Sequence, residues 1–247
     1  SEISGIVESV GSGVNAFRAG DEIYGATNEQ FIGGYAEYAV AAAGMIARKP
    51  KALSFVEAAS APVVAVTAWQ MLFDYAQVAA GQTALVQGAA GNVGAYAVQL
   101  AARAGVRVIG TAAGRDADYV RGLGAEKVID YSANRFEDFV GGVDAVIHTV
   151  GGEIRERSFG VLKGGGILVS VVSPKPQEGK RPNDVRMAFF IVEVTTARLD
   201  WLTALFDSHA LKAHVGSVLS LEDARTAHEM LAGAPHNRGK IVLDVNA

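Results

Sequence analysis

The stretch ALVQGAAGNVGAYAVQLAARAG, residues 84–105, predicts a strand, a glycine-rich turn and a helix. Its glycines at 88, 91 and 94 are spaced G-x-x-G-x-x-G, which differs from the commoner G-x-G-x-x-G dinucleotide fingerprint. Glycine permits a tight turn, lets the backbone approach a diphosphate and lets the helix pack on the sheet. Free N–H groups at the start of a helix over 93–104 would then face the phosphates. The alternative interpretation is a compact turn that binds no ligand.

The residues that follow favour the phosphate-binding interpretation, because strands and helices alternate after Gly81. Such alternation is typical of a parallel sheet covered on both faces. We expect strands at 83–87, 106–110, 127–130, 145–149, 166–171 and 189–194. We expect helices at 93–104, 115–123, 136–140, 153–161 and 199–208.

The two ends of the chain have β character. Short apolar runs at 3–10, 22–24 and 36–40 are separated by glycine-rich turns. Ser54 and Glu57 predict a capping box, and Pro62 divides the helical stretch that follows. The end of the chain predicts a strand after Ala213, a helix over 221–231 and a strand over 240–245. We therefore expect an α/β fold in which a Rossmann-type doubly wound parallel sheet, residues 63–210, is inserted in a β domain, residues 1–62 and 211–247.

Composition limits the classes of function. The chain has 247 residues, of which 50% are hydrophobic and 19% charged, with a net charge of −4 and no cysteine. It has no basic run of the kind that tracks nucleic acid and no apolar run of the ~20 residues that span a membrane. The absence of cysteine is consistent with a reducing compartment, and we expect a cytoplasmic protein. The residues from Ser1 onward already have the pattern of a β-strand, so we expect a fragment that lacks the N-terminal part of the β domain.

The end of the second strand of the alternating region indicates which dinucleotide is bound. NAD-binding proteins place an acid there for the ribose hydroxyls, whereas this chain has small residues, Thr111 and Ala112, followed by Arg115. Small residues leave room for a 2′-phosphate, and a guanidinium can bind it in bidentate fashion. The pattern favours NADP(H). The alternative is that Arg115 is a solvated residue at the start of a helix.

The motifs GQTALVQGAAGNVGAYAVQLA, GTAAG and GAEKVIDY together resemble the zinc-free, zeta-crystallin-like quinone oxidoreductases of the medium-chain dehydrogenase/reductase superfamily. SEISGIVESVGSGVNAFRAGDEIYG is similar to that superfamily's GroES-like domain, APVVAVTAWQML to its linking helix and RGKIVLDV to its closing strand. The resemblance covers essentially the whole chain. Two residues depart from the pattern: Asn92 replaces a glycine, and Ala102 replaces a lysine or arginine.

The resemblance implies a set of cofactor-binding residues that lie near the nicotinamide, the diphosphate or the adenosine. These are Thr67, Ala90, Gly91, Asn92, Val93, Tyr131, Thr149, Val150, Val171, Ser173 and Lys240. Alternatives stay open for several of them. If it does not bind the cofactor, Tyr131 is expected to be a half-buried loop aromatic. In the same case Val150 and Val171 would be core residues, and Lys240 would be an edge-strand residue that aids solubility.

The resemblance also argues against zinc. Where zinc-dependent relatives carry a metal-binding histidine and cysteine, this chain has Ser1 and Val63. The five histidines show no H-x-x-x-H spacing and are expected to be surface or core residues. We expect no metal site.

The reaction implied is hydride transfer from NADPH to a quinone or an α,β-unsaturated carbonyl. Tyr24 is the nearest candidate to stabilise the developing oxyanion, but a packing role is an equal alternative, and we assign no catalytic residue. No tyrosine is followed by lysine four residues on, which argues against a short-chain reductase. The alternative function is an NADPH-binding sensor or structural protein with little turnover. The apolar run at 187–194 predicts an edge strand that forms a homodimer, or else an ordinary buried strand.

Overall fold

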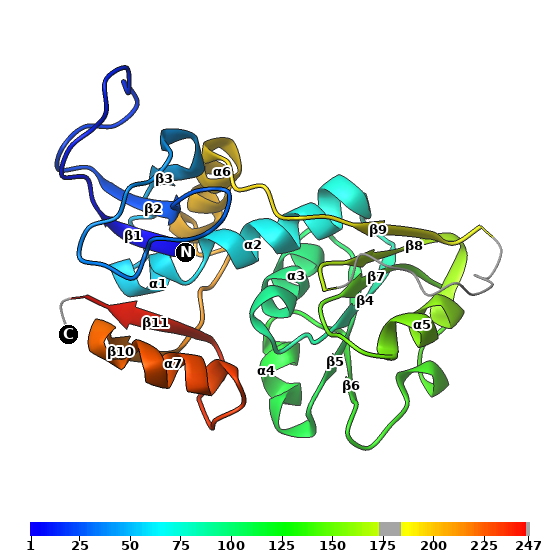
Figure 1. The fold of residues 1–247 in the computed structure, drawn as a ribbon. Helices are drawn as coiled ribbons and strands as arrows, with labels where there is room; N and C mark the ends of the chain where they lie inside the picture. The colour runs from blue at the N-terminus through cyan, green and yellow to red at the C-terminus, as the bar shows by residue number, and fades with distance from the viewer. Residues whose placement is uncertain (173–183, 246–247) are drawn as a thin grey trace. The chain divides into compact units, whose positions relative to one another are not determined.

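The structure, a computed structural model, describes residues 1–172 and 184–245 (Figure 1). Ser173, one of the predicted cofactor residues, lies outside the described residues. Contacts divide the chain into two units, Ser1–Val66 with Glu193–Ala247, and Thr67–Val192. Among the described residues, no helix combines the length and the apolar character needed to cross a bilayer.

The unit formed by residues 67–192 contains a six-stranded parallel sheet with the order β6-β5-β4-β7-β8-β9. Its strands are β4 (Thr83–Gln87), β5 (Arg107–Ala112), β6 (Lys127–Asp130), β7 (Val143–His148), β8 (Leu162–Ser170) and β9 (Arg186–Phe189). Its helices are α3 (Asn92–Arg103), α4 (Ala117–Gly122) and α5 (Ile154–Ser158), with 3-10 turns at Gly114–Asp116, Phe136–Asp138 and Phe159–Val161. The fold is thus the predicted α/β, Rossmann-type doubly wound sheet.

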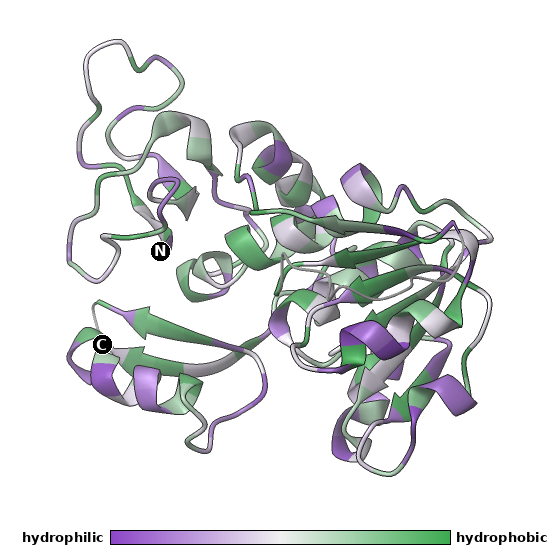
Figure 2. Ribbon diagram, turned by 45° about the vertical axis from the view of Figure 1, so that its right-hand side comes forward, coloured by the Kyte–Doolittle hydropathy of each residue, from purple (hydrophilic) through white to green (hydrophobic). Residues whose placement is uncertain are grey.

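The strand order explains where the helices lie. The chain runs outward from β4 to β6, returns to β7 beside β4, and then runs outward in the other direction. Because parallel crossovers are right-handed, the helices of the two halves cover opposite faces. Figure 1 shows α3 and α4 on one side of the sheet and α5 on the other. The strands themselves are strongly hydrophobic (Figure 2), as expected for a sheet buried on both faces.

The other unit combines a three-stranded antiparallel sheet with a two-stranded parallel one. Its elements are β1 (Glu2–Ile6), β2 (Glu22–Ala26), β3 (Ile46–Arg48), α1 (Phe55–Ala59), α6 (Thr196–Asp207), β10 (Val215–Ser220), α7 (Ala224–Leu231) and β11 (Lys240–Asp244). α2 (Pro62–Trp69) contains the boundary between the units and continues as a π-helical segment, Gln70–Tyr75. The predicted capping box is present, since Ser54 accepts from the Glu57 amide and Glu57 accepts from the Ser54 amide.

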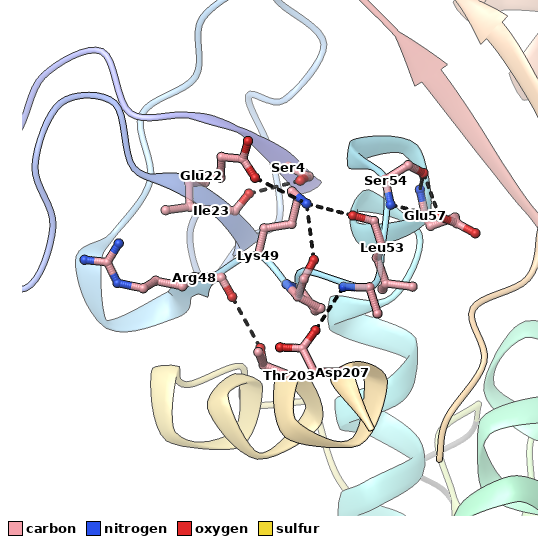
Figure 3. Close-up of polar contacts among 12 residues, drawn as sticks. Ser4, Glu22, Ile23, Arg48, Lys49, Leu53, Ser54, Glu57, Thr203 and Asp207 are labelled. Carbon is pink, nitrogen blue, oxygen red and sulfur yellow. Dashed lines mark hydrogen bonds and ion pairs between the residues drawn. The ribbon is translucent and has the colours of Figure 1, made fainter. Parts of the chain in front are cut away.

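Residues 193–210, which the sequence places in the nucleotide-binding part, group in the structure with the other unit. α6 belongs to the unit that contains β3, because hydrogen bonds join the two elements and their flanks (Figure 3). The Thr196 hydroxyl donates to the Ile46 carbonyl at 2.7 Å, the Thr203 hydroxyl donates to the Arg48 carbonyl at 3.3 Å, and Asp207 accepts from the Ala52 amide at 3.0 Å. Similarly, residues 63–66 lie in this unit.

Three local predictions also differ from the structure. Residues 36–40 form no strand, and Tyr38 and Val40 there are strongly exposed. The helix expected at 136–140 is only a 3-10 turn, Phe136–Asp138. The last strand lies earlier than expected, at Arg186–Phe189, where it pairs with β8 and forms the edge of the sheet.

An ion pair joins the Phe136–Asp138 turn to α5 and supplies a pH-dependent stability. Arg157 donates Nη2 to Glu137 Oε2 at 2.6 Å, donates Nε to the other oxygen, and lies over the Phe136 ring. The Arg157 hydrogen bonds lower the pKa of Glu137 from its ordinary value of 4.5 to about 2. Because the folded pKa is depressed, the stabilisation is complete above the ordinary pKa and is lost as pH falls toward the folded value.

We therefore expect Glu137→Gln to lower the free energy of unfolding at neutral pH and to flatten its decline below about pH 4.5. Urea titrations from neutral to acidic pH measure both effects. Glu126→Gln, a change at an exposed glutamate in the same unit, is the control and should follow the wild-type profile. Parallel acid profiles for wild type and Glu137→Gln would contradict this role of the pair.

Candidate functional site

The glycine turn after β4 allows a close approach between the strand and α3. Gly88 has a backbone φ of +70°, a conformation that residues other than glycine rarely adopt. A Cβ on Gly94 would lie 2.1 Å from the Gly88 carbonyl oxygen, so the first turn of α3 rests directly on the turn backbone. Gly91, the N-cap of α3, donates its amide to the same carbonyl at 2.9 Å. The glycines therefore serve packing and turn geometry together.

The entrance of α3 has the features of an anion-binding site. The first bond of the helix runs from the Ala95 amide to the Gly91 carbonyl at 2.8 Å, so the amides of Asn92, Val93 and Gly94 precede the helical ladder. No side chain caps this helix and its first turn contains no acid, whereas Ser54 caps α1 and Thr195 caps α6. Gly91 and Asn92 are exposed. The positive end of the helix dipole is thus open to a bound anion.

Two predicted residues that directly follow β7 lie beside this turn. A Cβ on Gly88 would lie 2.7 Å from the Thr149 hydroxyl oxygen and 2.8 Å from Val150 Cγ1. The Thr149 hydroxyl also donates to the Gln87 carbonyl at 2.6 Å. Between β4 and β7 the strand order reverses, and doubly wound folds bind ligands at the carboxyl edge of this point. Thr149 and Val150 are half-buried there.

A row of buried polar side chains underlies the same edge. Gln87, His148 and Ser170 are in register at the ends of β4, β7 and β8. Gln87 donates to Ser158 Oγ at 2.7 Å, and His148 Nδ1 lies 3.0 Å from Ser170 Oγ. Burial, followed by the Arg155 charge, lowers the pKa of His148 to about 4, so the ring is neutral at neutral pH. His148 is therefore a core histidine, as one of the two interpretations predicted.

Ser170 links these buried polar side chains to the backbone that follows β8. Its hydroxyl accepts from the Val172 amide at 3.3 Å, and the Val171 amide donates to the His148 carbonyl at 3.4 Å. Val171 is half-buried, next to the end of β8. Val171, a predicted cofactor residue, is thus held at the carboxyl edge of the sheet by the buried residues His148 and Ser170.

The ends of β5 and β6 carry the residues expected to bind the adenosine phosphate. Thr111 and Ala112 are buried, and the Thr111 carbonyl accepts from the Ala89 amide at 2.9 Å, which ties β5 to the glycine turn. The Arg115 side chain is 88% exposed, and its Nε lies 3.9 Å from Asp116 Oδ2, a long distance for an ion pair. Tyr131 is 59% exposed, and its amide donates to the Ala112 carbonyl at 3.2 Å. Both side chains are therefore accessible to a ligand.

Three further predicted residues lie in other surroundings. Thr67 is buried within α2. Lys240, in β11, pairs with the Glu2 carboxylate, which also accepts from the Val63 amide at 2.8 Å. Tyr24 is fully buried, donates to the Leu199 carbonyl at 2.7 Å and accepts from Thr203 at 3.0 Å. Burial raises the pKa of Tyr24, and these contacts support its packing role over an oxyanion role.

Metal ligands do not gather in the part of the chain that the structure describes. No group of three or more His, Asp or Glu side chains there is placed to hold a metal ion. Cysteine is absent from the sequence.

Comparison with known proteins adds to this geometry. A family model described as "Zinc-binding dehydrogenase" matches residues 123–243. Quinone oxidoreductase of Pongo abelii is 30% identical over 259 residues, covering 98% of this chain and 78% of that protein. The structure of the quinone oxidoreductase from Coxiella burnetii matches with a TM-score of 0.90 and 34% identity, covering 99% of this chain and 78% of that one.

The chain belongs to the quinone oxidoreductases of the medium-chain dehydrogenase/reductase superfamily. It is accordingly an oxidoreductase of a family that binds a nicotinamide cofactor. Two other similar proteins bear on the chemistry. The 2-methylene-furan-3-one reductase of Solanum lycopersicum is 35% identical over 184 residues, covering 70% of this chain and 47% of that protein. A mycobacterial structure complexed with NADPH matches with a TM-score of 0.84 and 30% identity, covering 98% of this chain and 81% of that one.

The sequence alone did not reveal several polar residues that shape the site. Gln87, Ser170 and Asp130 were not singled out, because each is the last residue of an apolar strand and no local motif marks it. A usable signal did exist. Polar residues that end consecutive parallel strands meet at one edge of the sheet, so their positions could have been combined.

The contact between Gly94 and Gly88 generates a direct prediction. Gly94→Ala should lower the free energy of unfolding by about 1–3 kcal/mol, because a Cβ would overlap the Gly88 carbonyl and displace α3. It should also weaken nucleotide binding, since the amides move with the helix. Thermal unfolding and a fluorescence titration with NADPH measure the two effects.

Gly122→Ala is the matched control, because Gly122 is also helical and a Cβ there would meet nothing within 4 Å. It should leave affinity unchanged and stability equal or slightly higher. Equal behaviour of the two variants would show that the close approach has no consequence.

Proposed function

We propose that this protein is an NADPH-dependent oxidoreductase that transfers hydride to a quinone or an α,β-unsaturated carbonyl without zinc. The observation that carries the proposal is the uncapped, glycine-led entrance of α3 at the point where the strand order reverses. Backbone amides and the helix dipole at such an entrance suit the diphosphate of a dinucleotide. We assign Ala90, Gly91, Asn92 and Val93 to this contact.

The preference for NADPH is supported by the residues at the ends of β5 and β6. Arg115 is exposed and makes a long ion pair with Asp116, and Tyr131 is exposed on the neighbouring loop. A guanidinium suits the geometry of a phosphate better than that of a ribose hydroxyl. We assign both residues to the 2′-phosphate, next to the small Thr111 and Ala112. The similar mycobacterial structure complexed with NADPH supports the same cofactor.

Bound NADPH supplies a hydride, and the acceptor takes that hydride and one proton to give the reduced product and NADP⁺. The chain's part is to bind and orient. We assign Thr149, Val150 and Val171, at the carboxyl ends of β7 and β8, to the nicotinamide half of the cofactor, and from the sequence alone we assign Ser173 to the same half. We assign Thr67 and Lys240 to further cofactor contacts. The neutral His148 and its partner Ser170 are buried at the ends of β7 and β8 and support the backbone of this edge.

The class of acceptor is supported by the relatives, which include quinone oxidoreductases and a 2-methylene-furan-3-one reductase. Zinc independence is supported by the lack of cysteine and by the scattered carboxylates and histidines of the described residues. No catalytic proton donor is assigned. The assembly that we propose is a cytoplasmic homodimer through the edge of β9, because a bare strand edge otherwise favours aggregation.

The proposal predicts loss of reduced-nicotinamide absorbance that depends on the acceptor, measured with NADPH and a panel of quinones and enones. NADH should support a slower rate at equal concentration, and a metal chelator should leave the rate unchanged. Tight NADPH binding without acceptor-dependent turnover would instead favour a sensor or structural role. No binding of either nucleotide would contradict the proposal as a whole.

Arg115→Ala tests the cofactor preference. The dissociation constant for NADPH should rise about tenfold or more, whereas that for NADH should change little, because only NADPH carries the 2′-phosphate. Arg121→Ala removes an exposed arginine that pairs with Asp118 on α4, and it is the matched control. Equal effects of Arg115→Ala on both nucleotides would refute the assignment.

A further inference from the structure

One carboxylate joins the two segments that carry Arg115 and Tyr131. Asp130 is the last residue of β6, and its Oδ1 accepts from the Ser132 amide at 2.9 Å and from the Ser132 hydroxyl at 2.6 Å. We propose that Asp130 is a positioning residue for cofactor specificity, which holds Arg115 and Tyr131 in the arrangement that receives a 2′-phosphate. This inference rests on the proposed function.

The other oxygen of the carboxylate faces the turn that carries Arg115. A Cβ on Gly114 would lie 2.5 Å from Asp130 Oδ2, so only glycine allows this turn to approach so closely. Gly114 opens the 3-10 turn Gly114–Asp116, and Arg115 is its next residue. The position of the guanidinium therefore depends on how firmly Gly114 is held against the carboxylate.

The backbones of the two segments are also joined. Ala112 and Asp130 are paired in the sheet, and the Tyr131 amide donates to the Ala112 carbonyl at 3.2 Å. Asp130 thus directly precedes Tyr131 in the chain and lies against Gly114, the residue before Arg115. A carboxylate that fastens both loops can organise two ligand-binding side chains without touching the ligand.

The charge of Asp130 allows an opposite expectation. A carboxylate near the adenosine ribose ordinarily binds its hydroxyls and repels a 2′-phosphate. Here the hydroxyl and amide of Ser132, with a smaller contribution from the Gly114 amide, lower the pKa of Asp130 against the effect of burial. Its oxygens are therefore engaged by donors of the protein. The two roles predict changes of opposite sign when the charge is removed.

Asp130→Asn separates these roles, because asparagine keeps the shape but replaces one accepting oxygen with an amino group. If Asp130 positions the loops, the dissociation constant for NADPH should rise about fivefold, while that for NADH changes less than about twofold. Asp118→Asn is the matched control, since Asp118 is an exposed carboxylate on α4 in the same unit. It should change neither constant.

Three outcomes would overturn the inference. Tighter NADPH binding by Asp130→Asn would show repulsion, equal weakening of both nucleotides would show a general structural role, and no change would show no role. If Asp130→Asn does not fold, Ser132→Ala gives a second test, because it removes one donor and leaves the carboxylate. It should weaken NADPH selectively, by less than Asp130→Asn, and equal effects on both nucleotides would again refute the positioning role.

The double variant Arg115→Ala/Asp130→Asn tests whether Asp130 acts through Arg115. If it does, the second substitution should add little to the loss of NADPH affinity caused by the first, whereas independent effects would multiply. The same titrations distinguish this inference from the proposed function. Wild type that shows no preference for NADPH contradicts the proposed function. A preference that is lost in Arg115→Ala but kept in Asp130→Asn contradicts only the role of Asp130.

Discussion

The contact between the first turn of α3 and the carbonyl of Gly88 is the constraint on which the rest of the site depends. It requires a hydrogen in place of a side chain at Gly94, and a left-handed backbone at Gly88. The helix entrance is consequently held next to β4 without a capping side chain, so its amides remain available to an anion. The neighbouring strands are tied to the same turn, β5 through Thr111 and β7 through Thr149. One close approach thus places three strand ends around one helix entrance.

The elements with a strong local signal were predicted well. The strand at Thr83–Gln87 was expected with the same bounds, and α3 differs from its expected range by one residue at each end. Their glycine spacing and apolar runs act within a few residues, so the sequence alone was sufficient. Residues 36–40 show the opposite case. Their alternation suits a strand, but a strand also needs a partner, and the pairs of the antiparallel sheet involve only β1, β2 and β3.

α6 shows why the division of the chain was harder to predict than its elements. The helix is expected at nearly its observed position, yet it groups with a different unit from the one that the sequence suggests. Its partners are backbone and side-chain groups about 150 residues earlier in the chain, such as the Ile46 and Arg48 carbonyls. A helical pattern reports which face is apolar and says nothing about which sheet covers that face. Alternation with preceding strands was therefore a poor guide at 193–210, although it located the strands from β4 to β8.

The cofactor preference also depends on a contact between segments that are separate in the sequence. The end of β5 carries no acid, which favours NADP(H). In the fold, the end of β6 is a direct neighbour, and it brings the carboxylate of Asp130 next to Gly114. What a carboxylate does at such an edge depends on the donors that already occupy its oxygens, and here Ser132 supplies two of them. The acid that we propose to bear on specificity therefore lies one strand away from the position at which the usual fingerprint places it. In that proposal, the hydrogen bonds to its oxygens matter more than its presence.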